Sequence, residues 1–166
     1  MKFDKSKKIL VIGRAGMDIY PEPPGTKITD VKDFSTHLGG SAANTCVALS
    51  KLGVNSDLVT CISDDAIGEY ILNKLKDFNV GSGFCRKVDK VYQTQLAVVE
   101  TILKNNQSIL YRNNSCDLQL KKDDIDQINF QDYSAVFISG TALSSSPSRE
   151  AVFYASGKAS TLSIPL

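Results

Sequence analysis

The residues best suited to chemistry are a carboxylate, an amide and two glycines in the first third of the chain. Asp18 lies shortly beyond the apolar run Lys8–Gly13, and Asn44 follows the pair Gly39-Gly40. Carboxylates accept hydrogen bonds, whereas a carboxamide both donates and accepts them. Two glycines remove side chains where a bound molecule could approach the backbone closely. This set could bind a polyol such as a sugar.

A helix is predicted directly after the two glycines. Ser41 suits its N-cap and Gly53 suits the left-handed residue beyond its end, with small or apolar residues at helical spacing between them: Ala42, Cys46 and Leu49. A tight turn without a ligand is the alternative, since glycine marks turns in general. A dinucleotide site is not indicated, because no Gly-x-Gly-x-x-Gly opens a helix after the first strand.

Three apolar, β-rich runs predict buried parallel strands, and helical patterns lie between them. The runs are Lys8–Gly13, Ser56–Ile62 and Ser134–Gly140, and Asp64-Asp65 suits the start of a second helix. Thr161–Leu166 begins another strand-like run. The fold class is therefore α/β. Asp18 then lies at the carboxyl end of the sheet, where open α/β sheets bind ligands. Its alternative role is that of a solvated loop residue that favours a turn.

Two segments predict a cover over this end of the sheet. Thr26–Phe34 suits one or two short exposed strands, and a break in regular structure is predicted before it by Pro21, Pro23, Pro24 and Gly25. Thr94–Arg112 contains two β-rich runs around a short polar loop, which predicts an antiparallel hairpin. A flap that excludes water would suit group transfer. Lys121–Asp126, by contrast, is predicted to be a solvated helix or turn.

Composition narrows the class of protein. The chain has 166 residues, 42% of them hydrophobic and 22% charged, with a formal charge of +1, which suits one globular domain. No global field favours nucleic acid or an anionic membrane. The apolar run Ile9–Ile12 is too short for a signal peptide, so we expect a cytoplasmic protein. Four cysteines without a Cys-x-x-Cys pair and the single His37 predict reduced thiols and no metal site.

The order of these features resembles the N-terminal half of the ribokinase-like (PfkB) carbohydrate kinases. The resemblance runs from about Ile9 to about Ala155, and Gly39-Gly40-Ser41-Ala42-Ala43-Asn44 followed by Asp64-Asp65-Ala66-Ile67-Gly68 carries it. It implies a three-layer fold with a mainly parallel central sheet and a small β lid. Residues 1–166 would form the sugar-binding portion, with lid segments near 26–34 and 94–112. Cys46 and Ser63 depart from the usual pattern, but both are small.

The resemblance also implies the site and the substrate. The sugar-binding positions of the family carry over onto Asp18, Gly39, Gly40 and Asn44. The stretches Gly13–Pro21 and Ser139–Leu143 look most like the branch that phosphorylates 5-dehydro-2-deoxy-D-gluconate in myo-inositol catabolism. Arg112, at the end of the hairpin, would then bind the carboxylate of this sugar acid. A solvated surface arginine is the alternative.

The catalytic parts belong to the other half of such kinases. Their catalytic aspartate, anion hole and ATP pocket are C-terminal, and no Gly-Ala-Gly-Asp-like motif occurs in these 166 residues. We therefore expect no catalytic, cofactor-binding or metal-binding residue in this chain, although a full-length enzyme would use ATP and Mg²⁺. Other kinases, of 2-dehydro-3-deoxygluconate, fructose or ribose, and a non-catalytic remnant stay open as alternatives. The resemblance also allows a homodimer formed through the lid.

Overall fold

The central sheet has four parallel strands in the order β5-β4-β1-β8. The computed structural model describes residues 6–166, and its central strands are β1 (Lys8–Ile12), β4 (Ser56–Ser63), β5 (Gly81–Val88) and β8 (Tyr133–Ile138). Val11 lies opposite Leu58 of β4 and Phe137 of β8. β4 is buried along its whole length. The continuous apolar runs thus form a parallel sheet, as predicted.

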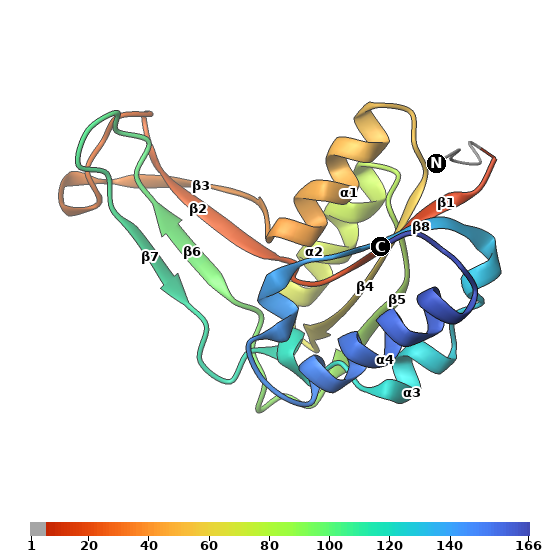
Figure 1. Cartoon of the computed structure of the whole chain (residues 1–166). Helices are drawn as coiled ribbons and strands as arrows, with labels where there is room; N and C mark the ends of the chain where they lie inside the picture. The colour runs from red at the N-terminus through yellow and green to blue at the C-terminus, as the bar shows by residue number, and fades with distance from the viewer. Residues whose placement is uncertain (1–5) are drawn as a thin grey trace.

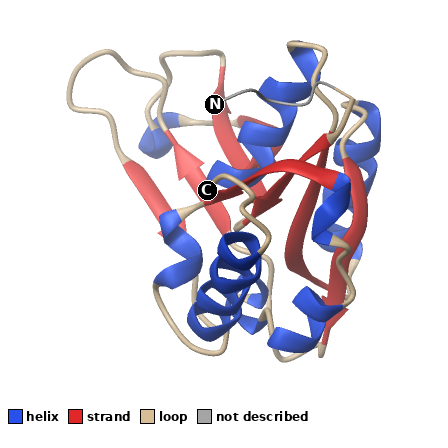
Figure 2. Cartoon of the chain, turned by 45° about the vertical axis from the view of Figure 1, so that its right-hand side comes forward, coloured by secondary structure: helices blue, strands red, loops and turns tan. Residues whose placement is uncertain are grey.

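Helices cover both faces of this sheet and make three layers (Figures 1 and 2). One face carries α1 (Ser41–Lys51) and α2 (Ala66–Asp77), and the other carries α3 (Lys122–Asp126) and α4 (Ser148–Thr161). Side chains alternate along β1, so Val11 packs in the core beneath α1 and α2, whereas Leu10 and Ile12 pack in the other core. The predicted three-layer α/β fold is confirmed.

A second, smaller sheet stands off the central one (Figure 1). Its strands, in the order β3-β2-β6-β7, are β2 (Gly16–Glu22), β3 (Asp33–Gly39), β6 (Leu96–Val99) and β7 (Ser108–Tyr111). β6 and β7 pair antiparallel, with Leu96 opposite Tyr111, which is the hairpin predicted within Thr94–Arg112. We call this four-stranded sheet the lid.

The other lid strands lie mostly outside the predicted segment Thr26–Phe34. That segment contains a 3-10 turn, Ile28–Asp30, and only the first residues of β3. The prediction treated Pro21 as a break, but Pro21 lies within β2 opposite Phe34 of β3. On its other side β2 pairs with β6 only at Met17–Ile19. Pro21 therefore has a partner strand on one side alone, where a residue without an N–H is tolerated.

The two lid hairpins are joined at their outer loops by a buried carboxylate. Glu100 accepts hydrogen bonds from the backbone N–H of Ile28, at 2.8 Å, and of Gln107, at 2.9 Å. The N–H of Gly25 also donates to the hydroxyl of Thr101. These bonds connect a loop of the first hairpin to that of the second, so the lid forms one unit.

Two further expectations need correction. Thr161–Leu166 suits a strand by sequence, but α4 continues to Thr161, and Pro165 then accepts a hydrogen bond from the N–H of Val136 in β8. Lys121–Asp126 is not wholly solvated either: Asp124 is buried and forms a two-pronged ion pair with Arg86 at 2.5 and 2.9 Å.

Within residues 6–166, no helix is long and apolar enough to span a membrane.

Candidate sugar-binding site

The predicted site lies where the lid joins the central sheet. β2 begins just after β1 ends, and β3 ends just before α1 begins, so the lid strands start and finish beside the carboxyl end of β1. Asp18 is in β2, opposite His37 of β3. A Cβ atom placed on Gly39 would lie 2.1 Å from Oδ1 of Asp18. The Asp18 carboxylate thus occupies the space that the glycine leaves.

Gly40 makes the turn from the lid into α1. Its φ of 93° is in the region that favours glycine, and a Cβ there would lie 2.4 Å from the carbonyl oxygen of Arg14. Gly40 is also the N-cap of α1, a role predicted for Ser41. Because Ser41 starts the helix instead, its hydroxyl is free to share a 2.6 Å hydrogen bond with Ser139 beyond β8.

The structure therefore brings Asp18, Gly39 and Gly40 together, and Asn44 lies one turn into α1. The N–H of Asn44 donates to the carbonyl of Gly40 at 2.9 Å, while its side chain is exposed. An exposed amide in the first turn of α1 and a half-buried carboxylate in β2 can each pair with the hydroxyl groups of a polyol.

The Asp18 carboxyl is shifted toward its neutral form. Burial raises its pKa above the ordinary 3.8. Three neighbours oppose this shift without cancelling it, the guanidinium of Arg14 most strongly, then the hydroxyl of Tyr20 and the ring of His37. The ionised form is the one that accepts hydrogen bonds at both oxygens, so binding of a polyol should depend on this titration.

We expect the affinity for a neutral polyol to fall as the pH falls through the pKa of Asp18, at a midpoint above 3.8. A neutral ligand is the right probe because it does not titrate itself. Calorimetric titrations between about pH 4 and 7 would measure the midpoint. Asp18→Asn should bind weakly throughout this range, with no such midpoint. An unchanged affinity across the range in the parent chain would contradict the assignment.

Arg112 lies just beyond β7, as predicted, but it is not a solvated arginine. Its Nη2 donates to Oδ2 of Asp117 at 2.6 Å and to the carbonyl of Thr141 at 3.0 Å. Its Nη1 donates to the hydroxyl of Ser144 at 3.3 Å. Its Nε is buried and has no hydrogen-bond partner among the residues that the structure describes. Arg112 is thus fixed in place with its buried Nε donor unused.

Two charged residues of this region escaped the sequence analysis. Asp117, in a 3-10 turn at Cys116–Gln119, is buried beside Arg112. Arg14 follows Gly13 at the end of the first strand, and its half-buried guanidinium feels the charges of Arg112, Asp117 and Asp18. The position of Arg14 directly after a strand-ending glycine was the one available signal. Nothing in the sequence around Asp117 indicates that it is buried.

Comparison with known proteins places these features in a family. The family model described as pfkB family carbohydrate kinase matches residues 6–159. The chain belongs to the pfkB family of carbohydrate kinases. Two similar relatives of this family member are the 5-dehydro-2-deoxygluconokinases of Clostridium perfringens, 36% identical over 158 residues, and of Photobacterium profundum, 34% identical over 152 residues. These matches cover 93% and 92% of the chain but only 47% and 46% of the relatives.

Solved structures of sugar kinases show the same fold. An uncharacterized sugar kinase from Pyrococcus horikoshii superposes with a TM-score of 0.80 at 28% identity, over 95% of this chain and 53% of the other. The same archaeal protein has been solved in complex with ATP. The 2-dehydro-3-deoxygluconokinase of Thermotoga maritima superposes with a TM-score of 0.83 at 18% identity, which shows the fold alone. The pfkB family chain thus spans about half the length of its curated relatives.

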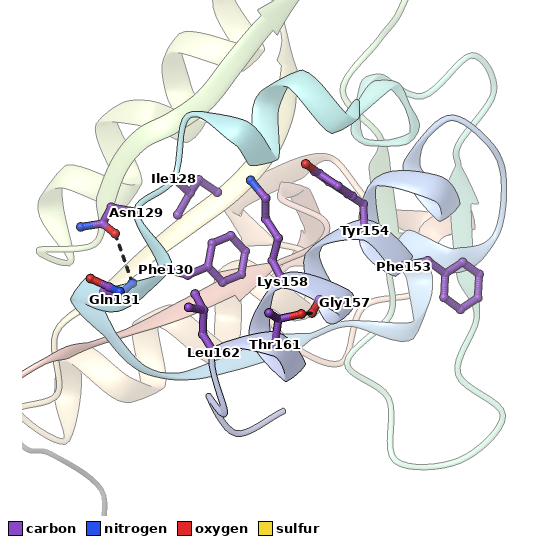
Figure 3. A pocket seen from close by; sticks show the side chains of 10 residues that line it. All are labelled: Ile128, Asn129, Phe130, Gln131, Phe153, Tyr154, Gly157, Lys158, Thr161 and Leu162. Atoms are coloured by element: carbon purple, nitrogen blue, oxygen red, sulfur yellow. Dashed lines mark hydrogen bonds between the residues drawn. The ribbon is translucent and has the colours of Figure 1, made fainter.

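A hollow beside α4 contains none of the predicted sugar-site residues of this pfkB family chain (Figure 3). Its cation, Lys158, lies 5.0 Å from the ring centroid of Tyr154 and 6.0 Å from that of Phe130. Asp126 neutralises Lys158 through a 2.5 Å ion pair. Because the charge of Lys158 is already compensated, we do not assign an anion site to this hollow.

The cysteines and acidic residues of this pfkB family chain add no further chemistry. Burial raises the pKa of Cys46 and Cys116 to about 11 and that of Cys61 to about 12, so these thiols stay neutral and are poor nucleophiles. No group of three or more His, Cys, Asp or Glu side chains in the described part of the chain could hold a metal ion. We therefore assign no Mg²⁺ ligand among the described residues and derive no step through this ion.

Proposed function

We propose that this chain is the sugar-binding portion of a cytoplasmic, ATP-dependent kinase of 5-dehydro-2-deoxy-D-gluconate in myo-inositol catabolism. The names of two relatives at 34% and 36% identity support this substrate. The observation that carries the proposal is the cationic base of the lid, where the guanidinium of Arg14 feels the charges of both Asp18 and Arg112. A sugar acid needs both a hydroxyl acceptor and a cation, and this site offers both.

The residues of the chain would bind and orient the substrate. Asp18 accepts hydrogen bonds from the sugar hydroxyls, and the glycines let the sugar approach the turn into α1. Arg112 binds the carboxylate, and the lid excludes water from the site. ATP, when bound to a complete enzyme, supplies the phosphoryl group. We propose that the chain alone binds the sugar acid without phosphorylating it.

A kinase of a neutral sugar such as fructose or ribose is the second candidate. The observation that favours it is the ion pair of Arg112, whose charge Asp117 already compensates without a ligand. In that case Arg112 would have a structural role. A kinase of 2-dehydro-3-deoxygluconate would keep the carboxylate and therefore the same role for Arg112.

A homodimer formed through the lid is also proposed. β7 is the edge strand of the lid, and all four of its residues are exposed, with Ile109 at 38%, Leu110 at 47% and Tyr111 at 57% exposure. An exposed apolar edge strand favours pairing with another strand. We expect the parent to sediment as a dimer and Leu110→Lys to sediment as a monomer. A monomeric parent would refute the pairing.

Calorimetry with two matched ligands tests the proposed substrate. We expect the purified chain to bind 5-dehydro-2-deoxy-D-gluconate more tightly than its primary amide, which has a similar shape and no charge. In the same preparation, ATP and Mg²⁺ should produce no sugar phosphate. Equal affinities for acid and amide would favour the neutral-sugar kinase. Phosphorylation that Asp18→Ala abolishes would refute the proposed inactivity of the chain alone.

A further inference from the structure

Arg14 is held at the junction of sheet, lid and helix. Its carbonyl oxygen accepts a 3.3 Å hydrogen bond from the N–H of Ala43 in the first turn of α1. The same carbonyl lies against Gly40, where a Cβ atom would be 2.4 Å away. The backbone of Arg14 therefore cannot move without disturbing the turn that carries the predicted sugar-binding glycines.

The guanidinium of Arg14 lacks an acceptor. Its Nε is buried without a hydrogen-bond partner among the described residues, although buried donors are nearly always paired. Burial lowers its pKa, and the neighbouring Arg112 lowers it further. Asp117 and then Asp18 raise it, by smaller amounts. The electrostatic surroundings of Arg14 thus favour another negative group.

Arg112, whose charge acts on Arg14, presents a second unused donor among the described residues. Ser115 donates to Oδ1 of Asp117, and Oδ2 of Asp117 accepts the 2.6 Å bond from Arg112. The side chain of Asp117 is 2% exposed, so this ion pair is shielded from water. The pair uses Nη2 of Arg112 and leaves its Nε buried and unpaired. Asp117 therefore fixes the orientation of Arg112 without satisfying all its donors.

We propose that Arg14 is a second carboxylate-binding residue of the sugar site and that Asp117 is the positioning residue that holds Arg112 beside it. This inference rests on the proposed acid substrate. The two oxygens of a carboxylate match two guanidinium donors that have no acceptor. The ligand class is a polyol that carries a carboxylate, and Arg14 contributes to its distinction from a neutral sugar.

The test measures affinities for 5-dehydro-2-deoxy-D-gluconate and its primary amide by calorimetry. Arg14→Gln should lower the affinity for the acid roughly tenfold to a hundredfold and leave that for the amide nearly unchanged. Lys104→Gln, which removes an exposed cation from the lid loop, should change neither affinity and serves as the matched control. Equal acid affinities for Arg14→Gln and the parent would overturn the role of Arg14.

A double-mutant cycle tests Asp117. Asp117→Asn should weaken acid binding severalfold in the parent but cost no further affinity in the Arg112→Ala background, because a positioning residue acts only through its partner. Equal losses in both backgrounds would overturn the positioning role. Where Asp117→Asn does not fold, Ser115→Ala replaces it, since this change removes a donor to Asp117 and otherwise only a long, 3.4 Å contact with Gln95.

These outcomes separate the inference from the proposed function. A parent chain that does not prefer the acid over the amide would refute the acid substrate, and the inference with it. The inference alone would be refuted if the parent prefers the acid, Arg112→Ala loses this preference and Arg14→Gln keeps it.

Discussion

Replacing Arg112 with alanine is expected to weaken binding of 5-dehydro-2-deoxy-D-gluconate roughly tenfold to a hundredfold. Loss of a charge-assisted hydrogen bond costs about 1.5–3 kcal/mol, which corresponds to this range. The change also leaves the buried Asp117 without its 2.6 Å ion pair, so an uncompensated negative charge would repel the substrate carboxylate. Calorimetric titration of parent and variant measures the difference.

Two controls separate recognition of the acid from damage to the fold. The primary amide of the substrate should bind both chains with nearly equal affinity, because it lacks the charge that Arg112 would bind. The double variant Arg112→Ala/Asp117→Asn removes the buried charge and should still bind the acid weakly. If the parent and Arg112→Ala bind the acid equally well, Arg112 has only a structural role, and the neutral-sugar kinase becomes the better proposal.

The sequence predicted well those parts of the fold that depend on local pattern. The run Lys8–Gly13 is apolar without alternation, and it became β1, buried between two layers of helices. Asp65 was expected to cap the second helix, and its carboxylate accepts from the N–H groups of Ile67 and Gly68. Each of these features is decided by residues close to one another in the chain.

The features that the sequence did not predict depend on distant residues. Pro21 was predicted to break regular structure, but it is tolerated in β2 because the pairing of β2 with β6 ends at Ile19, two residues before Pro21. Ser41 reads as an N-cap, but Ser139, 98 positions away, binds its hydroxyl instead. Asp124 reads as solvated, but Arg86, 38 positions away, pairs with it.

The candidate site shows the same division. Asp18, Gly39, Gly40 and Asn44 were predicted from their types and spacing, and the structure brings the first three of them together at the base of the lid. The environment of Arg112 could not be predicted, because Asp117, Thr141 and Ser144 reach it from separate segments. Arg14 was overlooked for a related reason: the burial of its Nε arises only where sheet, lid and α1 meet.

The two glycines of the site should respond differently to alanine. In Gly39→Ala, the new Cβ would lie 2.1 Å from Oδ1 of Asp18, which is the end of a side chain that can rotate away. We therefore expect the fold to survive and affinity for the amide ligand to fall roughly tenfold, because the hydrogen bonds of a misplaced carboxylate are lost. The loss should resemble that of Asp18→Ala.

In Gly40→Ala, the new Cβ would lie 2.4 Å from the carbonyl oxygen of Arg14 and 2.8 Å from Cα of Ala15, both of them backbone atoms. Backbone cannot rotate away, and the φ of 93° is strained for alanine. We expect the free energy of unfolding to fall by about 1–3 kcal/mol from the strained backbone, and further from the clash.

Urea denaturation measures the free energy of unfolding, and calorimetry measures the affinity of all variants. Gly83→Ala is the control, because its Cβ would meet nothing within 4 Å, and it should change neither quantity. If Gly39→Ala retained full affinity, the Asp18 carboxylate would not be part of the sugar site; if Gly40→Ala were as stable as Gly83→Ala, the tight turn would not be what positions α1.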